Sequence, residues 1–379
     1  MTSPGSTGLP PATGAWQAGD PVGRRQWLRP DGAVRLESGA LLPEVVLAYE
    51  TWGTLAADGS NAVLIEHALT GDSHAAGEVE PGHPSPGWWD GLIGPGRALD
   101  TDELFVVVSN VLGGCQGSTG PASLAPDGGH WGSRFPRVTI RDQVSVEVAL
   151  ADALGIERWA AVLGGSMGGM RALEWAVMRP ERVRALLVFA SPAAASADQI
   201  AWASPQLHAI LADANWRGGD YHAAGPGEGP HRGLGVARRI AHATYRSELE
   251  LDRRFGRRPQ DGEDPASGGR FAVESYLDHH ADKLVRRFDA ASYVWLTRSM
   301  NGHDVGRDRG GVAEALARVR ARTIAVGVDS DRLYPPAQVR ALADGIPGAR
   351  YAELASPYGH DSFLIETEQV AALVKDLLK

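Results

Sequence analysis

The sequence predicts an α/β fold in which a mostly parallel, doubly wound sheet carries an inserted segment of helices. Short apolar runs recur along the chain and alternate with segments of helical periodicity. We expect strands at residues 45–49, 62–65, 104–108, 159–163, 183–189, 323–328 and 351–354. More than a hundred residues with helical patterns and no convincing strand separate the run at 183–189 from the run at 323–328. This arrangement indicates a helical lid inserted into the sheet.

The same patterns divide the chain into a tail, a core and a lid. Residues 1–22 are rich in small and polar residues and show no apolar periodicity, so we expect a flexible tail that buries too little surface to offset its ordering entropy. Residues 23–194 and 321–379 are expected to form the sheet domain, and residues 195–320 the lid. Helices are expected at residues 143–154 and 167–178 in the core, and at residues 196–213, 235–245 and 278–292 in the lid.

Composition narrows the class of protein. The 379 residues are 43% hydrophobic, which is ample for a large core, and they carry a formal net charge of −9 without a basic run that would bind nucleic acid or anionic membrane. The single cysteine excludes an internal disulfide, and neither a membrane-spanning apolar stretch nor a signal-peptide pattern is present. We therefore expect a cytoplasmic globular protein without nucleic-acid or membrane partners.

Residues 164–168 read Gly-Gly-Ser-Met-Gly and lie between an apolar run and a helical segment. A strand, a tight turn and a helix in this order form the setting of a nucleophile elbow. The turn needs small residues two positions to either side of the nucleophile, and Gly164 and Gly168 supply them. Ser166 is therefore the predicted nucleophile, and a glycine-rich turn with a structural serine is the alternative.

Partners for Ser166 follow it in the order acid, then histidine. Asp331 comes after the apolar run at 323–328 and His360 after the run at 351–354, so each lies on a loop that follows a strand. His360 would remove the proton of the serine hydroxyl, and an ionised Asp331 would hold the imidazole in the required tautomer. Asp329 is the rival acid on the same loop. Three residues in this order and setting predict a catalytic triad.

Several longer strings carry a resemblance to a known family. They include Leu-Ala-Tyr-Glu-Thr-Trp-Gly at 47–53, His-Ala-Leu-Thr-Gly-Asp-Ser-His at 67–74, Asn-Val-Leu-Gly-Gly-Cys-Gln-Gly-Ser-Thr-Gly-Pro at 110–121, Ala-Arg-Arg-Ile-Ala-His-Ala-Thr-Tyr at 237–245 and Gly-His-Asp-Ser-Phe-Leu at 359–364. Over nearly its full length the chain resembles the homoserine O-acetyltransferases of the α/β-hydrolase superfamily, which serve L-methionine biosynthesis. The resemblance implies the α/β-hydrolase fold and transfer of an acetyl group from acetyl-CoA to L-homoserine, giving O-acetyl-L-homoserine and CoA by a ping-pong mechanism through acetyl-Ser166.

Two backbone N–H groups are needed to hold the oxyanion that forms during acyl transfer. The N–H of Met167, directly after the nucleophile, is the first. The loop after the run at 62–65 would supply the second, and the resemblance points there to Leu69, with Thr70 as the neighbouring alternative.

The resemblance also implies groups that would bind an amino-acid acceptor. Arg238 would bind the carboxylate of homoserine, because a guanidinium suits a bidentate contact, and Asp361 would bind the ammonium. Without the resemblance, Arg238 and Arg239 stand equal as candidates. Tyr245, seven residues after Arg238 and thus on nearly the same helical face, is a further candidate for the pocket, and packing within the lid is its alternative.

No bound cofactor and no metal are expected. Asp72 and His74 are close neighbours on one loop, so hydrogen bonding within the loop is a simpler interpretation than a metal site. His279 and His280 lack the spacing that puts two ligands on one helix face, and no phosphate-binding glycine motif occurs. Acetyl-CoA and L-homoserine are the expected small-molecule partners, as substrates, and the resemblance implies a homodimer formed through the lid.

Other functions remain open at this point. The same fold could use succinyl-CoA as the donor or serine as the acceptor. A serine esterase would keep the triad without the acceptor, and a non-catalytic binding protein could use the same scaffold, because fold does not fix function.

Overall fold

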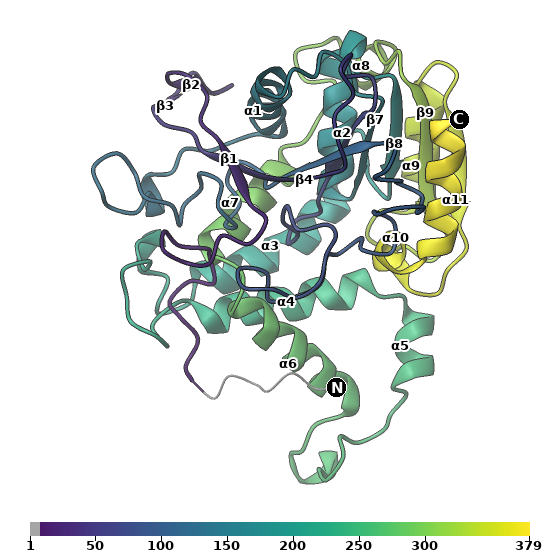
Figure 1. Ribbon diagram of the computed structural model, residues 1–379. Helices are drawn as coiled ribbons and strands as arrows, with labels where there is room; N and C mark the ends of the chain where they lie inside the picture. Colours follow the sequence, from purple (N-terminus) through teal and green to yellow (C-terminus); the bar gives the residue numbers. More distant parts are fainter. Residues whose placement is uncertain (1–7) are drawn as a thin grey trace.

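The computed structural model describes residues 8–379, and an eight-stranded sheet forms its centre (Figure 1). The strand order is β1-β4-β6-β5-β7-β8-β9-β10, in which β4 runs antiparallel to β1 and β6 and the other neighbours are parallel. The strands are Gln26–Leu28 (β1), Leu47–Trp52 (β4), Ala62–Glu66 (β5), Phe105–Ser109 (β6), Ala161–Gly165 (β7), Ala185–Phe189 (β8), Arg322–Val328 (β9) and Arg350–Leu354 (β10), and Val34–Arg35 (β2) pairs separately with Leu41–Leu42 (β3). The predicted mostly parallel, doubly wound sheet is confirmed.

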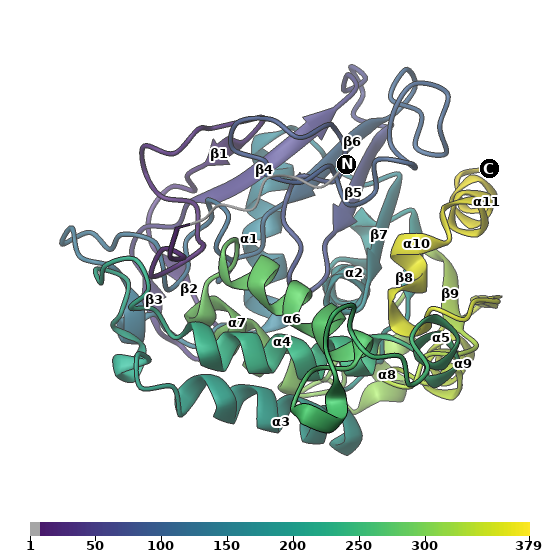
Figure 2. The same ribbon diagram turned by 90° about the horizontal axis from the view of Figure 1, so that it is seen from below.

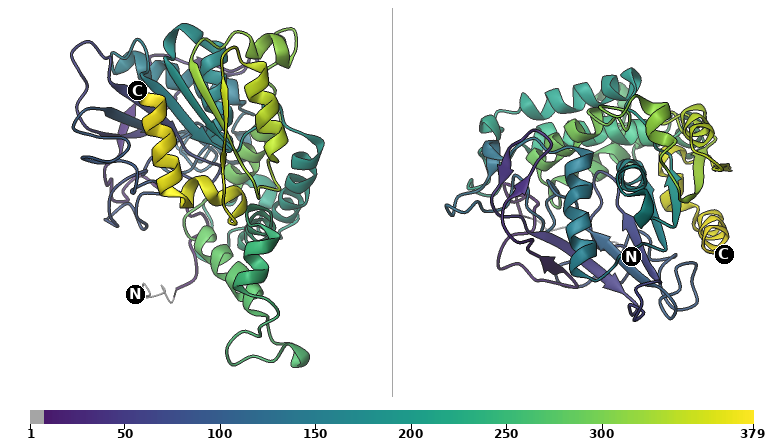
Figure 3. Two further views of the ribbon diagram at one scale, coloured as in Figure 1. Left: turned by 90° about the vertical axis from the view of Figure 1, so that its right-hand side faces the viewer. Right: turned by 90° about the horizontal axis from the view of Figure 1, so that it is seen from above.

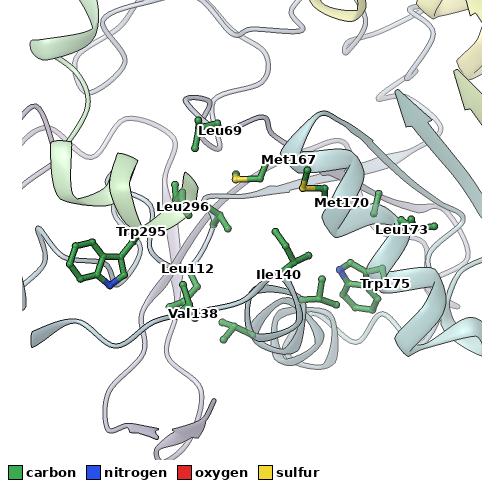
Figure 4. Packing of buried hydrophobic residues seen from close by; sticks show 14 of the residues in the cluster. Leu69, Leu112, Val138, Ile140, Met167, Met170, Leu173, Trp175, Trp295 and Leu296 are labelled. Atoms are coloured by element: carbon green, nitrogen blue, oxygen red, sulfur yellow. The ribbon is translucent and has the colours of Figure 1, made fainter. Parts of the chain in front are cut away.

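Helices cover both faces of the sheet (Figure 3). Residues alternate between the two faces along each strand, so that Leu64 of β5 lies in one hydrophobic core and Val63 and Ile65 lie in the other. The first core is closed by α1 (Ile140–Ala153), α2 (Met167–Met178) and α9 (Pro336–Gly345), and the second by α11 (Thr367–Leu378). Figure 4 shows the first core where Ile140 of α1 and Trp175 of α2 face each other.

The helices α3 to α8 all lie between β8 and β9 in the sequence, as expected for the lid. They are Ala197–Leu211 (α3), His231–Tyr245 (α4), Glu248–Arg254 (α5), Ala272–Val285 (α6), Ala290–Asn301 (α7) and Val312–Leu316 (α8). α4 packs between α3 and α6, and these helices gather on one side of the sheet (Figure 2). α8 packs against α9 instead, so the end of this segment lies on the core. The division of the chain into domains stays a prediction.

One expected lid helix is wrong in extent. The helix predicted at 278–292 is broken, because α6 ends at Val285 and α7 begins at Ala290. Asp289 lies at the break, and its buried carboxylate accepts the N–H of Ser292 at 2.7 Å, which caps the start of α7. A capping aspartate inside an otherwise helical pattern therefore marks the boundary.

The described part of the N-terminal stretch differs from the flexible tail expected from composition. Residues 1–7 of that tail lie outside the described residues. From residue 8 onward the chain makes specific contacts: Ala15 is buried, and the N–H of Trp16 donates to the carbonyl of Cys115 at 2.9 Å. Backbone hydrogen bonds and small side chains make these contacts, so the sequence shows no apolar periodicity that would predict them.

No helix in the described part of the chain is both long and apolar enough to cross a bilayer. The cytoplasmic location stays a prediction.

Candidate active site

Ser166 occupies the turn between β7 and α2 with φ 57° and ψ −124°, a strained conformation for a residue that has a side chain. Its N–H donates to the carbonyl of Phe189 at 3.0 Å, which fixes the turn against β8. Strand and helix pass so closely that a Cβ at Gly168 would lie 2.0 Å from the carbonyl oxygen of Glu66, and a Cβ at Gly164 would lie 2.2 Å from the carbonyl oxygen of Gly168. These are the features that a nucleophile elbow requires.

The imidazole of His360 and the carboxylate of Asp331 contact each other directly. His360 Nδ1 and Asp331 Oδ2 lie 2.7 Å apart, and both side chains are buried. The other carboxylate oxygen, Oδ1, accepts the N–H groups of Leu333 and Tyr334 at 2.8 and 3.0 Å. Burial alone would lower the pKa of His360, but the charge and hydrogen bond of Asp331 raise this pKa above its ordinary value. The pair therefore holds a proton on Nδ1 and leaves Nε2 available as a base.

Asp329, the rival acid, makes a different contact. Its Oδ1 accepts the N–H of Ser356 at 3.0 Å and so joins the loops that follow β9 and β10. The structure thus places Asp331, and not Asp329, against His360.

Ser166 and His360 line the same cavity, which has a volume of about 400 Å³. No hydrogen bond joins these two side chains in the described structure, and such contacts often tighten when substrate binds. Tyr334 is buried beside them, with its ring centroid 5.0 Å from that of His360, and its hydroxyl interacts with the side chain of Ser166. Burial raises the pKa of Tyr334, so the hydroxyl keeps its proton and can donate it in a hydrogen bond. Sequence reasoning missed Tyr334, because a tyrosine near Asp331 has no distinguishing pattern.

Of the two residues predicted for the oxyanion hole, Met167 directly follows the nucleophile and Leu69 lines the same cavity as Ser166. Met167 is the first residue of α2, so its N–H has no partner within the helix. Leu69 follows β5, lines the cavity and lies near Met167 in Figure 4. Thr70, the alternative, is engaged by the lid: its hydroxyl accepts from Arg238 at 3.3 Å and its carbonyl from Arg287 at 2.9 Å.

Arg238 and Arg239 are neighbours on α4 but face different surroundings. Arg238 lines the cavity, forms no ion pair with another described residue, and has a buried Nε without a hydrogen-bond partner. Arg239 instead pairs with Asp278 of α6 at 2.6 Å. An unpaired cation in a partly buried cavity favours the binding of an anion there, so Arg238 is the residue that suits a carboxylate ligand.

Asp361 and Tyr245 also line the cavity. Asp361 Oδ2 lies 3.4 Å from Nε of Arg246, a partner that sequence reasoning missed and that no local pattern could have indicated. Burial raises the pKa of Asp361, while the charges of Arg246, His360 and Arg238 oppose the rise. The ring of Tyr245 lies 5.7 Å from that of His360 and 5.8 Å from the guanidinium carbon of Arg238, between the predicted base and the predicted anion ligand.

Glu50, His74 and His83 are the buried cluster, among the described residues, whose side chains could together hold a metal ion. His74 Nδ1 lies 3.0 Å from Glu50, and Ser73 donates to the same carboxylate at 2.9 Å. The two imidazole rings stack at 3.8 Å with 9° between their planes, so their nitrogen lone pairs lie in two nearly parallel planes and do not converge on one point as tetrahedral coordination requires. The geometry suits a hydrogen-bonded network that joins β4 to the loop carrying His74.

The family model for the alpha/beta hydrolase fold matches residues 61–367. The homoserine O-acetyltransferase of Thermobifida fusca is 68% identical over 97% of this chain and 97% of the relative. The homoserine O-acetyltransferase of Clavibacter michiganensis subsp. michiganensis is 58% identical over 98% of this chain and 96% of the relative.

Solved structures of similar fold include a transferase and an esterase. The homoserine O-acetyltransferase of Bacillus anthracis superposes with a TM-score of 0.85 at 27% identity, covering 94% of this chain and 97% of that structure. Esterase E22 superposes with a TM-score of 0.83, also at 27% identity, covering 94% and 99%. The two relatives at 68% and 58% identity are both homoserine O-acetyltransferases, and neither is an esterase. The chain therefore belongs to the homoserine O-acetyltransferase family of the α/β-hydrolase superfamily.

Proposed function

We propose that the protein transfers the acetyl group of acetyl-CoA to the side-chain hydroxyl of L-homoserine, a step of L-methionine biosynthesis. The observation that carries this proposal is the unpaired guanidinium of Arg238 in the cavity that also contains Ser166 and Asp361. An ester hydrolase has no use for a cation and an anion placed to hold an amino acid, whereas a homoserine acyltransferase needs both.

The first half of the reaction acetylates Ser166. His360 Nε2 takes the hydroxyl proton as Ser166 Oγ bonds to the thioester carbon, and Asp331 stabilises the imidazolium that results. The N–H groups of Met167 and Leu69 hold the oxyanion. The C–S bond then breaks, the proton on His360 passes to the sulfur, and CoA leaves as the thiol.

The second half passes the acetyl group to homoserine. His360 takes the proton of the homoserine hydroxyl as its oxygen bonds to the acetyl carbon. The bond from that carbon to Ser166 Oγ breaks, and the proton on His360 returns to the serine. O-acetyl-L-homoserine leaves, and the enzyme is restored without any cofactor.

Acceptor recognition rests on opposite charges. Arg238 binds the carboxylate of homoserine, and Asp361 binds the ammonium, while Arg246 holds one oxygen of Asp361 in place. Tyr245 closes the cavity beside Arg238. Correct orientation of the acceptor can contribute roughly 7–11 kcal/mol through effective molarity, and this advantage lets homoserine outcompete water.

A serine esterase is the second candidate, since esterase E22 and the acetyl esterase MekB have similar structures at 27% identity. Both activities would use Ser166, Asp331 and His360. They differ in the dependence on the acceptor, because an esterase releases the acyl group to water whether or not homoserine is present.

We also propose that two copies associate through the lid. Large apolar side chains are exposed on its packed helices: Ile200 and Trp202 on α3 are each 40% exposed, and Val236 on α4 is 42% exposed. A dimer would remove these side chains from water. Light scattering coupled to size-exclusion chromatography tests this, and a molar mass that matches one chain would contradict it.

The function is tested by free-thiol release from acetyl-CoA and from succinyl-CoA, each with L-homoserine, with L-serine and without acceptor. We expect rapid release when acetyl-CoA and homoserine are both present, and loss of this release in Ser166→Ala. A preference for succinyl-CoA or for serine would change the proposed donor or acceptor but keep the mechanism. Thiol release that does not depend on an acceptor would favour the esterase. Release at the unchanged rate from Ser166→Ala would contradict the mechanism.

A further inference from the structure

A second hollow of about 610 Å³ lies on the lid between α4 and α6, which run side by side in Figure 2. Basic side chains dominate its lining: His231, Arg232, Arg239, His279, Lys283 and Arg286. Asp282 is the one carboxylate among the described lining residues. The hollow is therefore a concentrated positive site on a chain whose formal net charge is −9.

Some of these charges are already engaged, and others are not. Arg239 pairs with Asp278, and Arg286 donates to the carbonyl of Gly8 at 3.0 Å. Arg232 and Lys283 are exposed and form no ion pair with any described residue. These two side chains can therefore bind an external anion without breaking an existing ion pair.

Lys283 lines both the hollow and the Ser166 cavity, so the two lie next to each other at this residue. Arg287, four residues further along the chain and beyond the end of α6, lines the cavity, and His279, one turn before Lys283, lines the hollow. Residues four apart lie on one side of a helix, so His279 and Lys283 lie on one side of α6, roughly 6 Å apart along its axis at about 1.5 Å per residue. Together with Arg287 they mark a course from the lid surface to the Ser166 cavity.

The positive charges along this path act on one another. Partial burial of its ammonium group and the charges of Arg287 and Arg238 lower the pKa of Lys283. Burial lowers the pKa of Arg287, and the charge of Arg238 lowers it further, against the opposing charge of Asp72. The charge of Asp72 therefore offsets only part of the repulsion among these cations, and a bound anion would reduce the repulsion that remains.

We propose that the hollow between α4 and α6 binds the phosphate groups of CoA, with Arg232 and Lys283 as their ligands. This inference rests on the proposed function, in which acetyl-CoA is the donor. The thioester has to reach Ser166, and the neutral pantetheine arm can pass Lys283 into the cavity. The diphosphate and the 3′-phosphate then remain outside, where cationic side chains form charge-assisted hydrogen bonds with them.

The test compares two donors that differ in their phosphates. Acetyl-CoA carries them and acetyl-pantetheine does not, yet both present the same thioester. The variant Arg232→Ala/Lys283→Ala removes the proposed ligands. The control Arg253→Ala/Arg320→Ala removes the same number of exposed cations at distant positions, so both proteins have the same net charge.

We expect Arg232→Ala/Lys283→Ala to lower kcat/KM for acetyl-CoA about tenfold more than kcat/KM for acetyl-pantetheine, a ratio that corresponds to about 1.4 kcal/mol. Added salt should weaken the use of acetyl-CoA by the unmodified protein more than its use of acetyl-pantetheine. The control should show neither donor-dependent loss.

An equal loss for both donors, or an equal loss in the control, would overturn the phosphate site and leave the acetyltransferase intact. Failure of the unmodified protein to form O-acetyl-L-homoserine from either donor would instead overturn the proposed function. Turnover of acetyl-pantetheine also reports whether the variant is folded, so a misfolded protein cannot be mistaken for a loss of phosphate binding.

Discussion

Replacing Asp331 with asparagine should disable the base and leave the loop in place. The N–H groups of Leu333 and Tyr334 donate to Asp331 Oδ1, and an amide oxygen can accept both hydrogen bonds. The amide NH₂ would then face His360 Nδ1, which has to give up its proton to accept a hydrogen bond. The proton moves to Nε2, and His360 can no longer take a proton from Ser166.

The size of the effect follows from this tautomer. The wrong tautomer in a serine-histidine-aspartate triad costs about 10⁴-fold in kcat. That factor corresponds to about 5.4 kcal/mol, at about 1.36 kcal/mol for each factor of ten. The side chains of Asp331 and His360 are only 0% and 4% exposed, so water has little access to replace the carboxylate.

The assay is thiol release from acetyl-CoA at saturating homoserine, with Asp329→Asn as the matched control. Asp329 accepts one backbone N–H from Ser356, and an amide oxygen can do the same, so kcat should change by less than about threefold, in line with a small surface effect. Circular dichroism checks that both variants are folded. A loss of less than tenfold in Asp331→Asn, or comparable losses in the two variants, would refute the assignment.

Arg238→Lys should raise KM for homoserine roughly 30-fold, because about 2 kcal/mol of bidentate binding is lost. Arg239 pairs with Asp278 outside the cavity, so Arg239→Lys should leave KM nearly unchanged. Equal KM values for the two variants in steady-state kinetics would contradict the inward position of Arg238. Because the base has to be neutral and the pKa of His360 is raised, the acid limb of kcat/KM for acetyl-CoA should have its midpoint above 6.5, and a midpoint below 6.5 would contradict the His360–Asp331 pair. The His360–Asp331 pair should also stabilise the fold at low pH, where the activity is lowest. A raised folded-state pKa contributes stability below pH 6.5, and this stability is lost as the pH rises through the folded-state pKa. Urea unfolding of the wild type and of Asp331→Asn as a function of pH would detect the difference. Gly164→Ala should lower the free energy of unfolding by about 1–3 kcal/mol, since its Cβ would lie 2.2 Å from the carbonyl oxygen of Gly168, whereas Gly8→Ala, with nothing within 4 Å of its Cβ, should not change the urea midpoint.

The parts of the fold that were predictable from sequence are those encoded locally. Buried strands leave continuous apolar runs, and in a parallel sheet the loops after them meet at one edge. Ser166 and Asp331 follow such runs, and His360 follows β10, an edge strand that is only partly buried. The position of each residue after a strand predicts that the three side chains lie near one another.

The remaining features depend on contacts between distant segments. Nothing near Asp329 or Asp331 distinguishes the two, and the choice follows from where the loop after β10 delivers Ser356 and His360. Tyr334 and Arg246 reach the site through the packing of separate loops, without a sequence pattern of their own. Binary patterning describes which face of a helix is apolar but carries no information about such polar contacts.

The central claim is that the acetyl group resides on Ser166 between the two substrates. Mixing the protein with acetyl-CoA alone, quenching and digesting it should give the peptide that contains Ser166 with one added acetyl group in its mass spectrum. Adding L-homoserine before the quench should remove this acetyl group and yield an equal amount of O-acetyl-L-homoserine. An unmodified Ser166 peptide under conditions where product forms, or an acetyl group that homoserine does not remove, would contradict the account.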